Sequence, residues 1–136
     1  MKTQLDAYRK LILLMLHSKQ HMAHVMELKQ MTPIQGMLLM LFEPGEGKSM
    51  QELTQMMACD ASNTTGLIDR LDSHGYITRT TDPNDRRIKI VTLNKSGLQC
   101  REEVLLALRQ SETADLQKLS YQEQLSFVQI VDKLTS

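Results

Sequence analysis

The sequence predicts a mainly α-helical protein with one small β-hairpin, in the order α-α-α-α-β-β-α-α. Three observations predict this fold class: apolar residues at three-four spacing toward both chain ends, capping signals before successive helices, and one region of two-residue alternation. A chain of 136 residues with 41% hydrophobic and 24% charged residues can bury one core of ordinary size. We therefore expect residues 1–136 to form a single domain.

The first expected helix is long and begins near the N-terminus. Its apolar residues recur at three-four spacing from Leu5 through Tyr8 and Ile12 to Met26. Between residues 11 and 16 the helix is apolar nearly all round, so we expect it to be covered on two sides.

Membrane contact and export are not expected. The longest apolar run, Leu11 to Leu16, is too short to cross a bilayer, and the N-terminal segment lacks the small-residue cleavage site of a signal peptide. We therefore expect a cytoplasmic protein. Its net charge of zero, from 16 basic and 16 acidic residues, excludes no partner, because a DNA-binding protein needs basic groups on one surface only.

Capping signals divide the middle of the chain into three further helices. Residues 32–35 (TPIQ) combine a Thr N-cap, Pro at the first helical position and Gln at the third. Residues 49–52 (SMQE) form a second capping box that begins a short helix through about Met57. Asp60 can cap a third helix, which Gly75 ends. A short helix followed, after a tight turn, by another helix predicts a helix-turn-helix.

The pattern then changes to that of strands. Residues 76–80 and 88–93 are β-rich and roughly alternating, and they flank the polar segment 81–87 (TDPNDRR). We expect a hairpin with a polar tip. Asn94 can cap the next helix, and residues 120–123 (SYQE) form the capping box of the last one.

Three motifs in the middle of the chain are specific when they are taken together. They are MTPIQ at 31–35, ASNTTGLIDRL at 61–71 with Gly75 after it, and DPNDRR at 82–87 followed by VTLNKSG at 91–97. In order and spacing they resemble the MarR family of transcriptional regulators over about half of the chain.

The resemblance implies a fold and a function. It implies a winged helix-turn-helix lobe at residues 31–97, flanked by dimerisation helices at 1–28 and 98–136. It also implies a sequence-specific DNA-binding regulator, usually a repressor, whose partners are double-stranded DNA and a second copy of the chain. A small-molecule effector that weakens DNA binding is usual in the family, but nothing in the sequence names one, and no cofactor is expected.

The start of the expected recognition helix favours DNA contact. A helix entering the major groove needs small hydrogen-bonding side chains near its N-terminus, so that the backbone can come close. Four stand in a row: Ser62, Asn63, Thr64 and Thr65. The alternative is that they only cap the helix, but four exceed what one cap requires. Gly66 costs about 1 kcal/mol relative to Ala inside a helix, and we expect it to permit close approach, either to DNA or to a neighbouring helix.

Basic residues supply the other expected contacts. Arg70 either contacts phosphate or forms a surface ion pair, and its sequence context does not separate the two. Arginines at a hairpin tip suit a minor groove, whose negative potential attracts guanidinium groups. The resemblance assigns that insertion to Arg87, held by an ion pair with Asp85, and leaves Arg86 facing phosphates. Lys89 can add a phosphate contact, as can Arg79 and Lys95; the alternative is a solvated loop.

The apolar excess at both chain ends predicts a dimer interface. Its candidate residues are Leu5, Tyr8, Ile12, Leu105, Leu108, Leu125, Val128 and Val131. The alternative, that these helices close back on their own subunit, is weaker because a winged helix has its own core. A twofold dimer places two recognition helices on successive major grooves of a near-palindromic site.

Two features point to sensing. His17, His21 and His24 share one helix face at metal-ligand spacing, although a polar surface stripe is the interpretation we favour, so no metal is expected. Cys59 precedes the recognition helix, where a redox role would act on DNA binding directly. Structural filler is the interpretation that we favour for this thiol.

Enzymes and protein-contact modules are the two other classes of protein on which the sequence bears. The sequence has no nucleotide-binding loop, no paired catalytic carboxylates and no Ser/His/Asp arrangement, so we do not expect an enzyme. A winged helix can also serve protein-protein contact. The polar helix start and the two wing arginines argue against that use, because a protein-binding surface favours apolar or aromatic anchors.

Overall fold

The computed structural model describes residues 1–110 and 115–136, and all statements below concern these residues. In chain order the elements are α1 (Lys2–Glu27), α2 (Pro33–Leu41), β1 (Lys48–Ser49), α3 (Met50–Met56), α4 (Ala61–Ser73), β2 (Ile77–Thr81), β3 (Lys89–Leu93), α5 (Lys95–Gln110), the 3-10 helix η1 (Asp115–Lys118) and α6 (Tyr121–Thr135). The predicted dimerisation segment 98–136 includes residues 111–114, which lie outside the described residues.

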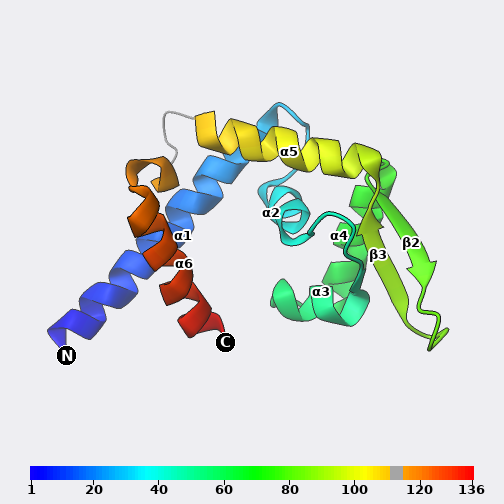
Figure 1. The fold of residues 1–136 in the computed structure, drawn as a ribbon, viewed down its shortest axis with the longest axis horizontal. Coiled ribbons are helices and arrows are strands. Elements are labelled where there is room, and N and C mark those ends of the chain that lie inside the picture. Colours follow the sequence, from blue (N-terminus) through cyan, green and yellow to red (C-terminus); the bar gives the residue numbers. More distant parts are fainter. Residues whose placement is uncertain (111–114) are drawn as a thin grey trace.

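Two groups of elements are joined by α5. Figure 1 shows α2, α3, α4 and the sheet gathered below one end of α5, whereas α1 and α6 extend from the other end, away from the sheet. Helix α5 contacts α1, α2 and β3, and so it ties the two groups together. The mainly helical, winged helix-turn-helix architecture predicted from the sequence is confirmed.

The sheet has three strands, one more than the predicted hairpin. β2 and β3 pair antiparallel from Ile77 opposite Leu93 to Thr81 opposite Lys89, and β1 pairs with the other edge of β3, which gives the order β1-β3-β2. β1 was missed because two residues are too few to show alternation. Its second residue, Ser49, is also the N-cap of α3.

The predicted helix starts are formed. The hydroxyl of Thr32 accepts from the Gln35 backbone N–H, and the Gln35 side chain accepts from the Thr32 N–H, so that capping box is complete. Asp60 accepts from the Asn63 N–H at 2.7 Å and caps α4. At α3, Ser49 accepts from the Glu52 N–H, but the Glu52 carboxylate accepts from the Ser49 hydroxyl rather than from its N–H. That box is therefore only half formed.

The core lies where the helix-turn-helix meets α1, α5 and the sheet. Leu67, Ile68 and Leu71 of α4 are buried, and they pack in one cluster with residues from α1, α2, β3 and α5. A Cβ at Gly36 would lie 2.7 Å from the Met26 side chain, so this glycine is what lets α2 approach α1 closely.

Asn94 closes the base of the wing. Its Nδ2 donates to the carbonyl of Gly75 at 2.8 Å, and its Oδ1 accepts from the Gly97 N–H at 2.9 Å. Gly75 has φ +77° after the end of α4, and a Cβ at Gly97 would lie 2.1 Å from the Tyr76 carbonyl oxygen. One side chain therefore caps α5 as predicted and also fixes the turn that follows α4.

Residues 2–20 of α1 and the whole of α6 leave their apolar side chains unburied in the single chain. Residues 11–16 of α1, predicted to be covered on two sides, are 37–62% exposed. No side chain of α6 is buried, and all of this helix lies in the described part of the chain. Leu105 and Leu108 of α5 are half-buried, and Leu108 packs against the chain's own core. Within residues 1–110 and 115–136, no helix has the length and apolar character needed to cross a membrane.

Candidate nucleic-acid interface

Helix α4 presents a small, polar face away from the core. Ile68 and Leu71 fix its buried side, and residues at three-four spacing share a face. Ser62 and Asn63 therefore lie on the exposed side, as does Arg70 two turns further along. The Asn63 amide donates to Asp60, which caps the same helix, at 3.4 Å. Thr65 is also exposed, and its hydroxyl donates to the Ala61 carbonyl.

Thr64 does not belong to this face, and the prediction that it contacts DNA is wrong. Its side chain is 1% exposed. Its hydroxyl lies 2.9 Å from the Thr54 hydroxyl, 3.1 Å from the Cys59 sulfur and 3.1 Å from the Asp60 carbonyl oxygen. Thr64 therefore joins α3 to α4 from inside the turn, where no duplex can reach it.

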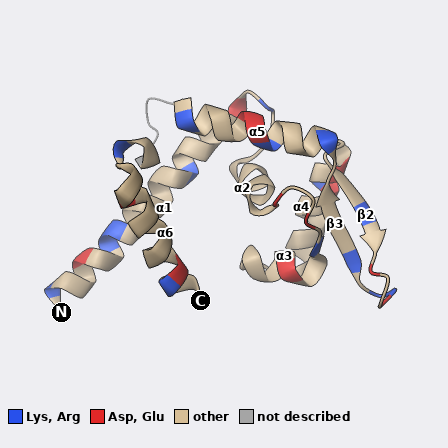
Figure 2. Cartoon of the chain, viewed as in Figure 1, with Lys and Arg blue, Asp and Glu red and all other residues tan. Residues whose placement is uncertain are grey.

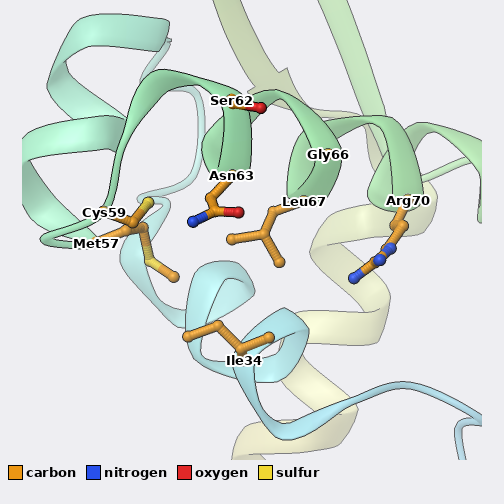
Figure 3. A pocket seen from close by; sticks show the side chains of 8 residues that line it. All are labelled: Ile34, Met57, Cys59, Ser62, Asn63, Gly66, Leu67 and Arg70. Atoms are coloured by element: carbon orange, nitrogen blue, oxygen red, sulfur yellow. The ribbon is translucent and has the colours of Figure 1, made fainter.

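A hollow of about 310 Å³ lies beside α4. It is lined by Ile34, Met57, Cys59, Ser62, Asn63, Gly66, Leu67 and Arg70. Figure 3 shows Asn63, Leu67 and Arg70 projecting from α4 on the side of Ile34, which belongs to α2. Arg70 forms no ion pair with any residue that the structure describes. The sequence left open whether Arg70 contacts phosphate or forms a surface ion pair, and the ion pair is not formed.

The predicted ion pair of the wing is present. The Arg87 guanidinium donates from Nε to Asp85 Oδ1 at 3.1 Å and from Nη2 to Oδ2 at 3.3 Å, and the Arg87 N–H also donates to Oδ1 at 3.0 Å. These bonds from the Arg87 side chain and then from its backbone hold the pKa of Asp85 below its ordinary value. The Arg87 side chain is nevertheless 91% exposed. Its orientation is fixed while its charge stays open to solvent.

The other basic residues of the wing differ in their partners. Arg86 is exposed, and Figure 2 shows basic residues at the tip of the hairpin. Lys89 is exposed and donates to the Thr81 hydroxyl across the strands at 3.3 Å. Arg79, a candidate phosphate contact, instead donates to Asp69 of α4 and lies 3.6 Å from Asp72.

Sequence reasoning missed the connection of Arg79 to α4. The signal was a pair of carboxylates three residues apart on a helix, Asp69 and Asp72, with an arginine on the next strand. The sequence does not show which strand face meets the helix.

The candidate sensor residues do not assemble into a metal site. Among residues 1–110 and 115–136, no three or more His, Cys, Asp or Glu side chains are placed to hold a metal ion. His21 is half-buried, whereas His17 and His24 are exposed. Both cysteines are free thiols, and Cys59 lies partly exposed at the hollow beside α4.

The fold and this surface define a winged helix-turn-helix transcriptional regulator. A model described as MarR family matches residues 31–89. Over this span the chain is similar to the MarR family of winged helix-turn-helix transcriptional regulators, which are DNA-binding proteins and not enzymes.

Two curated relatives are named as helix-turn-helix-type transcriptional proteins. The HTH-type transcriptional regulator YwhA of Bacillus subtilis is 24% identical over 106 residues, which are 78% of this chain and 76% of YwhA. The HTH-type transcriptional repressor NicR of Pseudomonas putida is 27% identical over 105 residues, 77% of this chain and 66% of NicR.

Solved structures share the whole fold. A probable transcriptional regulator from Pseudomonas aeruginosa is 28% identical, with a TM-score of 0.65 over 90% of this chain and 94% of that one. CouR from Rhodococcus jostii RHA1, bound to p-coumaroyl-CoA, has a TM-score of 0.79 at 22% identity, over 96% and 90%. A cysteine-to-serine mutant of MarR from E. coli, complexed with operator DNA, has a TM-score of 0.73 at 18% identity, over 98% and 96%.

Proposed function

We propose that this chain is a sequence-specific transcriptional repressor that binds a near-palindromic operator as a homodimer in the cytoplasm. The observation that carries the proposal is the Arg87 guanidinium, oriented by Asp85 and 91% exposed at the wing. An oriented, open guanidinium suits the negative potential of a minor groove. A protein of the same fold, the mutant MarR from E. coli, has been crystallised with operator DNA.

In this proposal, residues 31–97 form the DNA-binding lobe. The start of α4 enters the major groove, with Ser62, Asn63 and Thr65 near the base edges. Arg70 contacts phosphate, because its guanidinium is exposed and no described residue pairs with it. Arg86 and Lys89 contact phosphates beside the wing.

Selection from a random pool of duplexes tests the DNA-binding proposal. The expected product is an inverted repeat whose half-site centres lie about 10 base pairs apart, because a twofold dimer spans one helical turn. Arg87→Ala should weaken binding to the selected duplex, whereas Lys29→Ala, which removes one positive charge outside both the DNA-binding lobe and the proposed dimer segments, should not. Absence of enrichment would favour a protein-contact module instead.

We propose that residues 1–28 and 98–136 form the dimer interface. The predicted interface residues Leu5, Tyr8, Ile12, Leu125 and Val128 are 42–66% exposed in the single chain. Leu105 and Val131 are half-buried, and Leu108 adds only the part of its surface that the core leaves open. Apolar side chains gathered on two helices that stand clear of the lobe favour burial against a second copy.

Sedimentation velocity tests the dimer. Val128→Glu places a charge among the exposed apolar residues of α6 and should yield monomers. Gln129→Glu introduces the same residue one position later, where Ser126, Gln129 and Lys133 form a polar face at three-four spacing, and should remain dimeric. A monomeric wild type, or a dimeric Val128→Glu, would contradict the proposal.

Repression is the regulatory direction that we propose, as the name of NicR states for that relative. A reporter gene driven by a promoter that overlaps the selected operator should fall in output when the protein is expressed. A rise in output would identify an activator.

We also propose that a small molecule releases the DNA. CouR binds p-coumaroyl-CoA within the same fold, so p-coumaroyl-CoA and CoA alone are the first probes to titrate against the protein-operator complex. Release by the thioester and not by CoA would support an effector of this chemistry. The His17, His21 and His24 stripe and Cys59 are the alternative sensors, and chelator or oxidant sensitivity would favour them.

A further inference from the structure

We propose that Gly66 sets how closely α4 approaches DNA, so that the side chain missing at this position determines the affinity of the operator complex. This inference rests on the proposed function, in which α4 is the DNA-reading helix.

Gly66 has a local cost and no compensating role inside the chain. It is the sixth residue of the 13-residue helix α4, and a glycine inside a helix is less favourable than Ala. Among the described glycines only Gly45 and Gly75 have positive φ, so the backbone at Gly66 does not require a glycine. A Cβ built on Gly66 meets no described atom within 4 Å apart from its chain neighbours and the backbone of its own helix.

At two other glycines, the fold itself leaves no room for a side chain. A Cβ at Gly36 would meet the Met26 side chain at 2.7 Å, and a Cβ at Gly97 would meet the Tyr76 carbonyl oxygen at 2.1 Å. At those positions a neighbouring element occupies the space. The sequence left open whether Gly66 admits DNA or a neighbouring helix, and the open space at its Cβ position rules out a neighbouring helix.

The position of Gly66 on α4 points to an external partner. It follows Ser62 by one helical turn and precedes Arg70 by another, which places these residues in one row along the helix. Ile68 and Leu71, both fully buried, lie on the other side of α4. Figure 3 shows Gly66 as bare ribbon between Ser62 and Arg70, at the rim of the hollow.

The chemistry around Gly66 selects DNA over a second copy of the chain as that partner. Its exposed neighbours are the hydroxyl of Ser62, the amide of Asn63 and the guanidinium of Arg70. Such groups bond to base edges and phosphates. The exposed apolar residues that suit a second copy lie on α1 and α6, at the other end of α5 (Figure 1).

The test is the pair of changes that Gly66→Ala produces. The free protein should unfold at a higher temperature, because the helix gains propensity and the methyl meets no clash. Affinity for the selected duplex should fall at least tenfold, and Gly66→Leu should lower it further.

The outcomes separate this inference from the proposed function. If the wild type binds the duplex and Gly66→Ala binds equally well, Gly66 does not set the approach and only the inference is overturned. If the wild type binds no duplex, the proposed function fails first. A lower unfolding temperature for Gly66→Ala would also overturn the inference, because the space at Gly66 would then be needed within the chain.

Discussion

Arg79 of β2 donates a hydrogen bond to the carboxylate of Asp69 on α4, and the same guanidinium lies 3.6 Å from Asp72 one turn further along. The pair joins the first strand of the wing to the helix proposed to read the major groove. The Arg79 side chain is 40% exposed and that of Asp69 57% exposed, and ion pairs in water contribute only about 0–1 kcal/mol to stability. The main effect of the Arg79–Asp69 pair is therefore to set the position of the wing relative to α4.

Arg79→Gln should accordingly leave folding nearly intact and weaken DNA binding. The expected change in the free energy of unfolding is within about 1 kcal/mol, measured by urea denaturation. Affinity for the selected duplex should fall because the wing no longer keeps its place beside α4.

Asp69→Asn distinguishes this positioning role from a direct phosphate contact by Arg79. If the pair positions the wing, Asp69→Asn should also weaken binding, and the double variant should be no worse than either single one. If Arg79 contacts phosphate, Asp69→Asn should leave binding unchanged or tighter, and Arg79→Gln should reduce the salt slope by about one.

Asn94→Ala should destabilise the lobe. The substitution removes the cap of α5 and leaves the Gly75 carbonyl without the Asn94 donor, so the expected loss is about 2 kcal/mol. Asn94→Asp keeps the cap oxygen but loses the donor to Gly75, and its loss should be smaller. Equal urea midpoints for the wild type and Asn94→Ala would contradict this account of the wing base.

Gly97→Ala should lower the unfolding temperature, whereas Gly66→Ala should raise it. The added Cβ would lie 2.1 Å from a backbone oxygen, that of Tyr76, which cannot rotate away as a side chain can. Helix α5 would have to shift from β2, at an expected cost of about 2 kcal/mol or more. Thermal unfolding of the two variants side by side measures both changes in unfolding temperature. A stabilised Gly97→Ala would show that the contact relaxes freely.

The wing ion pair should persist across neutral and mildly acidic pH. Because Arg87 lowers the pKa of Asp85 in the folded protein, the pair's contribution is complete above the unfolded-state pKa of about 4. It is lost only as pH falls through the lower folded value. Carboxyl-carbon NMR should find the pKa of Asp85 below its ordinary value and find it raised in Arg87→Gln. An unchanged pKa in that variant would show that the pair does not form in solution.

Features set by local spacing could be predicted from the sequence. The caps at Thr32 and Asp60 each use a bond to a residue three positions on, and Asp85 and Arg87 are two residues apart. Thr64 could have been placed correctly as well, because it precedes Ile68 by four residues and Leu71 by seven and so shares their buried face. The prediction placed Thr64 at the DNA because its side chain is small and polar, and gave less weight to its helical spacing from Ile68 and Leu71.

Features set by tertiary arrangement could not be predicted. The strand β1 has two residues and exists only because β3 offers an edge for Lys48 and Ser49 to pair with. Arg79 and Asp69 are ten residues apart on different elements, and their contact depends on the angle between α4 and the wing. The open space at Gly66 depends likewise on where α2 and α3 lie.

The central claim is that α4 and the wing bind operator DNA, and fluorescence anisotropy of the selected duplex at two salt concentrations tests it most directly. We predict nanomolar affinity for the wild type at low salt, falling about 1,000-fold or more between about 50 and 200 mM salt. Arg87→Ala should bind much more weakly, with a salt slope smaller by about one. Absent or salt-insensitive binding by the wild type would contradict the claim.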